Sequence, residues 1–336
     1  MSIQISVIMP VYNGVDFIEK SLPPLIDMQR RGDILEVIVV DDGSTDHTVS
    51  MAEGYGARVI DSGGRLGPGG ARNVAAAQAA GEILWFVDAD VVVHEDAAKN
   101  MARAFDEEGV VAVFGSYDDR PPARNFFSQY KNLVHHYYHQ HAREEASTFW
   151  SGCGAVRKDA FLAVDGFDIE KYKYPSIEDI ELGHRLLSAG GQLRLKREVQ
   201  CTHLKVWRFG NLIHTEIFRR AIPWSRLIIQ SGEGIPNDLN VGATEQVRAV
   251  VAGLFTLCIL AALVGLLPAI WLVPATLVMV AANWEITRFF NRGHGPVFAC
   301  GALLFHQVYY LYSGAAFVFA YIEHAFLKLF GRTAQG

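Results

Sequence analysis

The sequence predicts an α/β domain with a mostly parallel central sheet, followed by helices that enter a membrane. Three observations lead to this prediction. Short apolar runs alternate with helical segments up to about residue 115. Pairs of aspartates follow two of these runs, at Asp41-Asp42 and at Asp88-Ala-Asp90. Farther along, the 36 residues from 249 to 284 contain no Asp, Glu, Lys or Arg. Continuous apolar strands are typical of parallel sheets covered on both faces, and uncharged tracts of this length are typical of lipid.

The first four strands and the helices between them follow in order. The strands are expected at the apolar runs Ile5–Met9, Leu35–Val40, Arg58–Ile60 and Ile83–Val87. Residues 17–30 have helical spacing, and a glycine turn at 67–70 opens an alanine-rich helix from 71 to 80. Ligands of parallel sheets bind beyond the carboxyl ends of the strands, which is where all four aspartates fall. Carboxylates clustered there favour a divalent cation that holds a phosphorylated ligand.

The next segment is rich in aromatic residues and histidines. Residues 126–141 carry them at helical spacing, and we expect an interfacial helix whose aromatic rings meet lipid. A metal site at His135 and His139 is the alternative, which is disfavoured because no Glu of an HExxH motif stands between them. The remaining elements are expected to be a glycine-loosened turn at 152–154, helices at 160–164 and 180–189, and a strand at 198–202.

The tail is expected to lie in a membrane. One straight helix over residues 249–284 would run about 54 Å, against about 30 Å of hydrocarbon, so the tract must fold back near Pro268. Residues 297–322 form a second uncharged tract, which is a third span unless it is an interfacial or re-entrant helix. Arg288 and Arg292 hold the loop between the tracts in the cytoplasm by the positive-inside tendency.

Composition argues against several other classes of protein. The net charge of −6 over 336 residues argues against a nucleic-acid-binding protein. The four cysteines stand apart, with no CxxC and no histidine at zinc-ligand spacing, which indicates reduced thiols rather than disulfides or a zinc site. Residues 3–11 run straight into a strand with no basic leader, so we expect no signal peptide and a cytoplasmic first half.

Five blocks of the sequence occur in the order found in family 2 glycosyltransferases. They are Val7-Ile-Met-Pro-Val-Tyr-Asn-Gly14, Val39-Val-Asp-Asp-Gly-Ser-Thr-Asp46, Gly69-Gly-Ala-Arg-Asn73, Asp88-Ala-Asp90 and Glu178-Asp179. Residues 4–205 resemble that family, and parts of residues 130–182 also look like a bacterial membrane-anchored subgroup. The resemblance implies a GT-A nucleotide-sugar-binding fold and inversion at the anomeric carbon. It divides the chain into a catalytic domain at 1–205 (donor half 1–115, acceptor half 116–205), a juxtamembrane interfacial segment at 206–246, and two or three transmembrane helices at 247–326.

The resemblance also implies a pocket for the base of a nucleotide sugar. Pro10, Tyr12 and Asn13 would line this pocket, and Asp42 would accept a hydrogen bond from the base. Residues 41 and 42 have an ordinary alternative role, as turn and N-cap residues for the helix that follows.

A phosphate and metal site is expected beside the base pocket. Arg72 and Asn73 follow a glycine turn at a helix start, where free amides and a guanidinium favour phosphate; an ordinary surface arginine is the alternative. Asp88-Ala-Asp90 resembles the DxD motif, so Asp90 is expected to bind Mn2+ or Mg2+ and Asp88 to touch the ribose or a metal-bound water. In related folds a histidine near the position of His203 can join the metal or the diphosphate, and a structural histidine is the alternative.

The acceptor side is expected to combine one acidic helix start with one loop. Asp179, beside Glu178, is expected to deprotonate an acceptor hydroxyl as it attacks the anomeric carbon, although acidic residues are also ordinary at helix starts. The run Trp150-Ser-Gly-Cys-Gly154 resembles the acceptor loop of the family. Trp150 could stack on a sugar ring, and Gly152 allows close approach of the backbone. Cys153 belongs to this loop but is not expected to be a nucleophile, because inverting transfer needs no covalent step.

Residues 203–230 combine five basic side chains and one acidic side chain with interleaved aromatic rings. Attraction of this stretch to anionic membrane lipid is one interpretation. A sharper one is that Arg219 and Arg220 hold the phosphate of a polyprenyl-linked acceptor. The QxxRW block of processive synthases is absent from the sequence, so one sugar per encounter is expected.

Together these features predict a metal-dependent, inverting glycosyltransferase of the hexosyltransferase type. It would move a sugar from a nucleotide-diphosphate sugar to a hydroxyl of a lipid-linked or membrane-associated acceptor. The expected place is the cytoplasmic face of the inner membrane, in the synthesis of a cell-envelope glycan, with no nucleic-acid partner. Two alternatives remain open: a polyprenyl-phosphate glycosyltransferase similar to dolichyl-phosphate-mannose synthase, and a catalytically inactive sugar-nucleotide-binding subunit.

Overall fold

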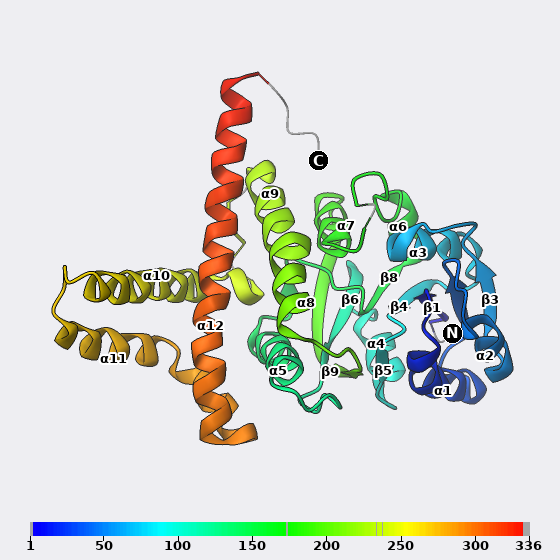
Figure 1. The fold of residues 1–336 in the computed structure, drawn as a ribbon. Coiled ribbons are helices and arrows are strands. Elements are labelled where there is room, and N and C mark those ends of the chain that lie inside the picture. Colours follow the sequence, from blue (N-terminus) through cyan, green and yellow to red (C-terminus); the bar gives the residue numbers. More distant parts are fainter. Residues whose placement is uncertain (1–2, 173, 233, 237, 332–336) are drawn as a thin grey trace. The chain divides into compact units, whose positions relative to one another are not determined.

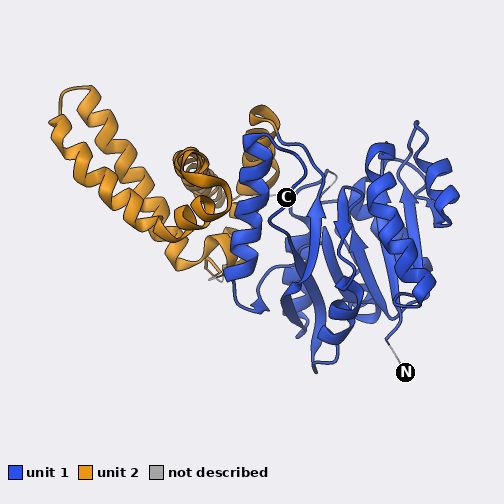
Figure 2. Cartoon of the chain, turned by 90° about the horizontal axis from the view of Figure 1, so that it is seen from below, with its two compact units in different colours: residues 1–207 blue, residues 208–336 orange. Residues whose placement is uncertain are grey.

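The computed structural model describes residues 3–172, 174–232, 234–236 and 238–331. The chain forms two compact units, residues 1–207 and residues 208–336 (Figure 2). The first unit contains the sheet and the helices α1 to α7, and the second is helical (Figure 1).

A nine-stranded sheet forms the centre of the first unit. Its strands are β1 (Ile5–Val11), β2 (Glu36–Asp41), β3 (Arg58–Asp61), β4 (Ile83–Val87), β5 (Val91–Val93), β6 (Val110–Tyr117), β7 (Glu145–Ala146), β8 (Cys153–Arg157) and β9 (Gln192–His203). Their order is β3-β2-β1-β4-β8-β6-β9-β5, with β7 paired to β9 outside this path. The neighbours from β3 to β4 are parallel, whereas β8 is antiparallel to both β4 and β6. The α/β class is therefore confirmed, but the sheet is mixed, and parallel pairing prevails only in the first half of the chain.

The parallel strands β1, β2 and β4 are buried because helices pack against them, whereas β3 is partly exposed. Ile5, Val7 and Met9 of β1 join a core cluster with apolar residues of α1 (Val15–Arg31) and α4 (Ala97–Ala104). Helix α3 (Gly67–Gln78), whose buried alanines lie outside that cluster, packs against β1 and β2. The other helices of this unit are α2 (Thr48–Tyr55), α5 (Phe126–His141), α6 (Lys158–Ala163) and α7 (Glu178–Ser188). The strands expected at residues 5–9, 35–40, 58–60 and 83–87 are confirmed to within two residues.

Helix α5 has the expected bounds but not the expected environment. It packs against β6 and β9 of the sheet. His139 is buried, with its Nδ1 atom 2.9 Å from the carbonyl oxygen of Gly115, and its ring lies against Phe114. The prediction of an interfacial helix is therefore wrong, because this aromatic face contacts the sheet rather than lipid.

The glycine-rich run at 152–154 is only partly a turn. Cys153 and Gly154 lie in strand β8, paired with Val87 and Phe86 of β4. A Cβ atom on Gly154 would lie 2.2 Å from the carbonyl oxygen of Trp150. Glycine is needed here because the preceding loop folds closely over the strand, not because the chain is loose.

The second unit begins with a continuous helical segment and ends with a long kinked helix. Its elements are α8 (Phe209–His214), the π-helix η1 (Thr215–Ala221), α9 (Ile222–Ser231), η2 (Leu239–Val241), α10 (Ala243–Leu263), η3 (Ala269–Trp271), α11 (Leu272–Ala282) and α12 (Trp284–Leu329). Helices α10 and α11 lie side by side and run crosswise to α12, which is kinked at Gly295 and Pro296 (Figure 1). Within the described residues, α10 and α12 are long and apolar enough to cross a membrane by length and composition.

Candidate active site

The loops that follow β1 and β2 are tied together by side-chain hydrogen bonds. The amide Oδ1 of Asn13 accepts from the backbone N–H of Thr45 at 2.8 Å, and the Asn13 N–H donates to the Ser44 hydroxyl at 2.9 Å. Asn13 itself has a left-handed backbone with φ of 48°, a conformation that asparagine tolerates better than most residues. Asn13 therefore shapes this edge of the sheet, and its contact with a base stays a prediction.

Asp42 caps helix α3 and binds the loop that precedes it. Its carboxylate accepts hydrogen bonds from the Ser62 hydroxyl at 2.8 Å, from the Leu66 N–H at 2.8 Å and from the Gly67 N–H at 2.9 Å. The last two donors lie at the start of α3, so Asp42 satisfies amides that a helix start leaves free. The sequence left open a role as N-cap of the next helix, but that helix, α2, has no side-chain cap, and Asp42 caps α3 instead. The predicted hydrogen bond to a base remains a prediction.

Tyr12 presents the open face of the expected base pocket, whereas Pro10 is buried within β1. The Tyr12 side chain is 40% exposed. The guanidinium carbon of Arg65 lies 3.6 Å from the centre of its ring, a cation–π contact. Arg65 was not anticipated, because nothing in the sequence links residue 65 to residue 12 before the fold brings their loops together.

Arg72 is the buried cation of the site. It is 2% exposed and forms an ion pair with Asp88 through Nη2. Its Nε and Nη1 atoms are also buried and have no hydrogen-bond partner among the described residues. A buried guanidinium with free donors is costly unless an acceptor arrives, and a diphosphate supplies acceptors in the geometry that arginine matches.

Asn73, next to Arg72, has a structural role. Its Nδ2 donates to the carbonyl oxygen of Phe167 at 2.8 Å, and its Oδ1 accepts from the Phe167 N–H at 2.9 Å. Both ends of the amide are therefore occupied by one main-chain segment. Asn73 therefore fastens α3 to the loop that follows α6, and its contact with a phosphate stays a prediction.

Asp88 and Asp90 follow β4, and the fold brings His203 from the end of β9 to them. His203 Nε2 lies 3.5 Å from Asp90 Oδ2, and its ring stacks on Tyr117 with the ring centres 4.4 Å apart. Burial raises the pKa of Asp90, but the hydrogen bond and charge of His203 outweigh burial and leave that pKa below its ordinary value. Burial raises the pKa of Asp88, and the negative charges of Asp90 and Asp179 add to this although Arg72 opposes it.

A divalent cation fits this pair of residues. In the described part of the chain, no group of three or more His, Cys, Asp or Glu side chains could hold a metal ion unaided. Asp90 and His203 would supply one carboxylate and one imidazole, which suits a cation that takes its remaining ligands from phosphate and water. The carboxylate of Asp88 is already paired with Arg72, so it is the less available of the two aspartates.

Asp179, at the start of α7, is held by the loop that contains Ser151. Its Oδ2 accepts from the Ser151 N–H at 3.1 Å, and its Oδ1 accepts from the Ile180 N–H at 2.9 Å. Glu178 is buried, and its Oε2 accepts from the Ser176 N–H at 2.7 Å. Burial, together with the charge of Asp179, raises the pKa of Glu178 to about 7. The two acids thus have unlike environments, with Asp179 the more accessible.

The same loop also contacts the segment after β4 that carries Asp88 and Asp90. The Asp88 N–H donates to the carbonyl oxygen of Gly152 at 3.1 Å. The indole of Trp150 lies over Gly152 and packs edge-on against Tyr117, with the ring centres 4.7 Å apart. Cys153 is fully buried in the core cluster, so we correct its expected contact with an acceptor to a packing role.

Arg219 and Arg220 belong to the second unit, where both lie on the π-helix η1. Arg220 Nη1 donates to Glu216 Oε1 at 2.8 Å, one helical turn away. This ion pair neutralises part of the positive charge that was expected to bind an acceptor phosphate. Phosphate binding by Arg219 and Arg220 stays a prediction.

Comparison with known proteins identifies a family for the first unit. Residues 6–164 match the family model described as glycosyl transferase family 2. The N-terminal unit belongs to that family. Among curated relatives of this family 2 domain, poly(ribitol-phosphate) β-N-acetylglucosaminyltransferase TarS of Staphylococcus aureus is 38% identical over 107 residues, which are 30% of this chain and 19% of TarS. Dolichyl-phosphate β-glucosyltransferase of Drosophila melanogaster is 30% identical over 164 residues, 41% of this chain and 48% of that enzyme. The chain thus spans less than half the length of either relative.

Solved structures support the GT-A-like fold. The mannosyltransferase PcManGT of Pyrobaculum calidifontis, in complex with GDP-Man and Mn2+, has a TM-score of 0.57 at 19% identity, over 95% of this chain and 88% of that one. Residues 1–349 of S. aureus TarS give a TM-score of 0.51 at 19% identity, over 99% of this chain and 93% of that one. At these identities the likeness concerns the fold alone.

Proposed function

We propose that the chain is a metal-dependent, inverting glycosyltransferase that moves one sugar from a nucleotide-diphosphate sugar to a hydroxyl of a membrane-associated acceptor. The observation that carries the proposal is the electrostatic arrangement around Arg72. Carboxylates from two distant segments, 88–90 and 178–179, influence one another beside a buried guanidinium that has two free donors. An anionic ligand with an accompanying cation would balance both charges and complete the hydrogen bonds of Arg72.

On the donor side, this chain would bind the two ends of the nucleotide with different residues. Tyr12 offers an exposed ring to the base, and the buried strand residue Pro10 would line the same pocket. Arg72 would donate to the diphosphate with its free Nε and Nη1 atoms. Asp90 and His203 would hold Mn2+ or Mg2+, which when bound withdraws charge from the departing nucleoside diphosphate. PcManGT, whose fold this chain shares, was solved with a nucleotide sugar and Mn2+, which agrees with this assignment.

On the acceptor side, Asp179 is the best placed base. The Ser151 and Ile180 amides hold its carboxylate, so it can take a proton from a hydroxyl without first reorienting. Glu178 is more deeply buried, and its pKa of about 7 leaves it only partly ionised near neutral pH, so Asp179 is the more accessible of the two carboxylates. The hydroxyl would attack the anomeric carbon as the nucleoside diphosphate departs.

The helical unit supports a membrane location. Two helices have the length and apolarity of spans, and the segment before them carries a basic, aromatic surface. We infer attachment to the cytoplasmic face of the inner membrane, where nucleotide sugars are found. Arg219 and Arg220 would then meet the anionic head groups of lipid or of a lipid-linked acceptor.

The test of the proposal is Asp179→Asn, measured on the full chain in detergent with a panel of nucleotide sugars and Mn2+. We expect kcat to fall by roughly 10²- to 10⁴-fold, the usual contribution of a general base, with an unchanged Kd for the donor. Glu181→Gln on the same helix is the matched control, because it removes the ion pair with Arg185 but lies outside the proposed site. Full turnover by Asp179→Asn would remove the base from the proposal.

Transfer to a polyprenyl phosphate is the second candidate, since dolichyl-phosphate β-glucosyltransferase is among the relatives. A phosphate acceptor is already an anion and needs no base, so the held carboxylate of Asp179 favours a hydroxyl. The product separates the two reactions: a sugar phosphate is hydrolysed by mild acid, whereas a glycoside is stable. Absence of any donor turnover with Mn2+ would instead indicate an inactive sugar-nucleotide-binding subunit.

A further inference from the structure

The second unit contains a helical hairpin, made of α10, the turn at 264–268, η3 and α11. Its base carries charged side chains. Arg248 Nη1 donates to Glu245 Oε1 at 2.6 Å, and its Nε donates to the carbonyl oxygen of Ala282 at 2.8 Å. Its Nη2 lies 3.4 Å from Glu285, whose side chain is 76% exposed. Arg248 therefore joins the two arms at the base of the hairpin. Because the charge of Glu285 is exposed there, the base is expected to lie in water or among lipid head groups.

Each arm is too short to cross a bilayer from this base. Residues 249–264 rise about 24 Å as a helix, and the return arm at 269–282 rises about 21 Å. The hydrocarbon core is about 30 Å thick. With its charged base at the head groups, the tip of the hairpin would end inside the hydrocarbon.

The tip is apolar and strongly exposed. Residues 263–270 contain no polar side chain. Val264 is 70% exposed, Leu266 82% and Ile270 71%. A loop that emerges into water normally carries the polar residues of turns, such as Asn, Asp and Ser. This tip has none, so its composition fits lipid.

The turn at 264–267 satisfies its own backbone donors. The N–H groups of Val264, Gly265, Leu266 and Leu267 all donate to carbonyl oxygens of residues 260–262, at 2.8 to 3.2 Å. Residue 268 is proline and has no N–H group. The hydroxyls of Thr256 and Thr276 donate to carbonyl oxygens within their own helices. Internal satisfaction of donors is required inside hydrocarbon, where water cannot replace a missing partner.

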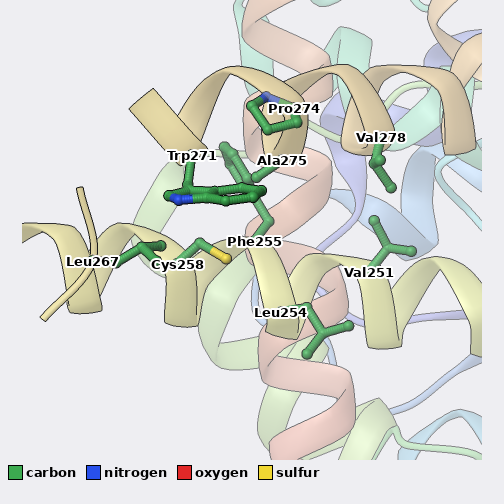
Figure 3. Close-up of a pocket in the computed structure, with 9 residues that line it drawn as sticks. All are labelled: Val251, Leu254, Phe255, Cys258, Leu267, Trp271, Pro274, Ala275 and Val278. Carbon is green, nitrogen blue, oxygen red and sulfur yellow. The ribbon is translucent and has the colours of Figure 1, made fainter. Parts of the chain in front are cut away.

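The two arms leave an open apolar groove of about 350 Å³ between them (Figure 3). The indole of Trp271 lies across it, above Cys258 and Leu267. Its other lining residues are Val251, Leu254, Phe255, Pro274, Ala275 and Val278. A groove lined in this way has no polar anchor for a polar ligand, and lipid acyl chains are the occupant that its chemistry suits.

We propose that the hairpin enters the bilayer from one face, turns within the hydrocarbon and returns to the same face. It is then an anchor in one leaflet rather than the pair of spans that the sequence predicts. The proposal rests on the membrane location given under the proposed function.

Cysteine labelling tests the depth of the tip. Single cysteines are placed at Leu266 and, as a matched control at the exposed base, at Gln246, in a chain carrying Cys258→Ser and Cys300→Ser. Right-side-out and inverted membrane vesicles are treated with a membrane-impermeant maleimide before and after detergent. We expect Gln246→Cys to be labelled in inverted vesicles, and Leu266→Cys in neither kind until detergent is added.

Each other outcome overturns the proposal in a recognisable way. Labelling of Leu266→Cys in right-side-out vesicles would show that the hairpin spans the bilayer. Labelling of Leu266→Cys in inverted vesicles would show that the tip lies in water. Sugar transfer is assayed on the same vesicles, so that absent transfer with the expected labelling counts against the proposed function alone.

Discussion

The proposed donor site can be tested at Arg72, because two of its hydrogen-bond donors have no partner in the described structure. Two buried donors, Nε and Nη1, have no partner within the described residues, while Nη2 is paired with Asp88. A hydrogen bond to a charged group contributes about 1.5–3 kcal/mol. If both donors bind the diphosphate, Arg72→Met should weaken UDP or GDP binding by at least about 3 kcal/mol, which is roughly 150-fold in Kd.

The measurement is isothermal titration calorimetry of the full chain with UDP and with GDP, in the presence of Mn2+. Arg72→Lys should fall in between, roughly tenfold weaker, because one ammonium cannot serve Asp88 and match the fork geometry of a diphosphate. This variant keeps the positive charge beside Asp88, so it separates lost binding from an unfolded chain.

Arg157→Lys is the matched control. Arg157 donates to the carbonyl oxygens of Val110 and Phe105 at 2.9 Å and 2.7 Å. It pairs with Ile83 at the start of β4, at the opposite end of the strand from Asp88. Its substitution should lower Tm without changing Kd. A folded Arg72→Met protein with unchanged nucleotide affinity would refute the assignment of Arg72 to the donor.

Three further predictions follow from the site. Asp90→Asn and His203→Ala should each raise the Mn2+ concentration needed for half-maximal nucleotide binding by roughly tenfold or more, in the range known for disturbed metal sites. Equal Mn2+ dependence in these two variants and in the unaltered chain would contradict the metal assignment. The pKa of Glu178 is raised to about 7 by burial first and by Asp179 second, so its ionisation opposes folding as pH rises from about 4.5 to 7. Glu178→Gln should therefore increase the free energy of unfolding by about 3 kcal/mol at pH 8 and hardly change it at pH 4.5. An equal increase at both pH values would show that the raised pKa of Glu178 is not its cause. Cys153→Ala should retain kcat while lowering Tm, because Cys153 is a buried strand residue; loss of activity in a chain of normal Tm would show a catalytic part for its sulfur.

The parallel half of the sheet could be predicted from the sequence because the patterns that identify its strands and turns are local. An apolar run, an aspartate pair and a glycine turn each identify an element without knowledge of what it packs against. The aspartates at 41–42 and 88–90 could be placed at strand ends for this reason. The same reasoning failed for α5, since helical spacing reports a face but not whether that face meets lipid or a sheet.

Several site residues depend on distant partners that no local pattern reveals. Asn73 pairs with Phe167, which is 94 residues away, and the sequence gives no sign of this pairing. Tyr12 meets Arg65 across two loops, and His203 meets Asp90 through the pairing of β5 with β9. The antiparallel strand β8 was missed because its glycines look like a turn, although they are required by Trp150 passing over the strand.

The hydrogen bond from the Asp88 N–H to the Gly152 carbonyl oxygen has a practical consequence for protein engineering. Exchanging residues 148–154 for the equivalent loop of another enzyme, in order to change what is glycosylated, would also move the residue that pairs with Arg72. Chimeras of this kind would lose nucleotide affinity together with their original selectivity. Grafts that keep Gly152 and Gly154 and vary only side chains around them are the more promising starting point for redesign.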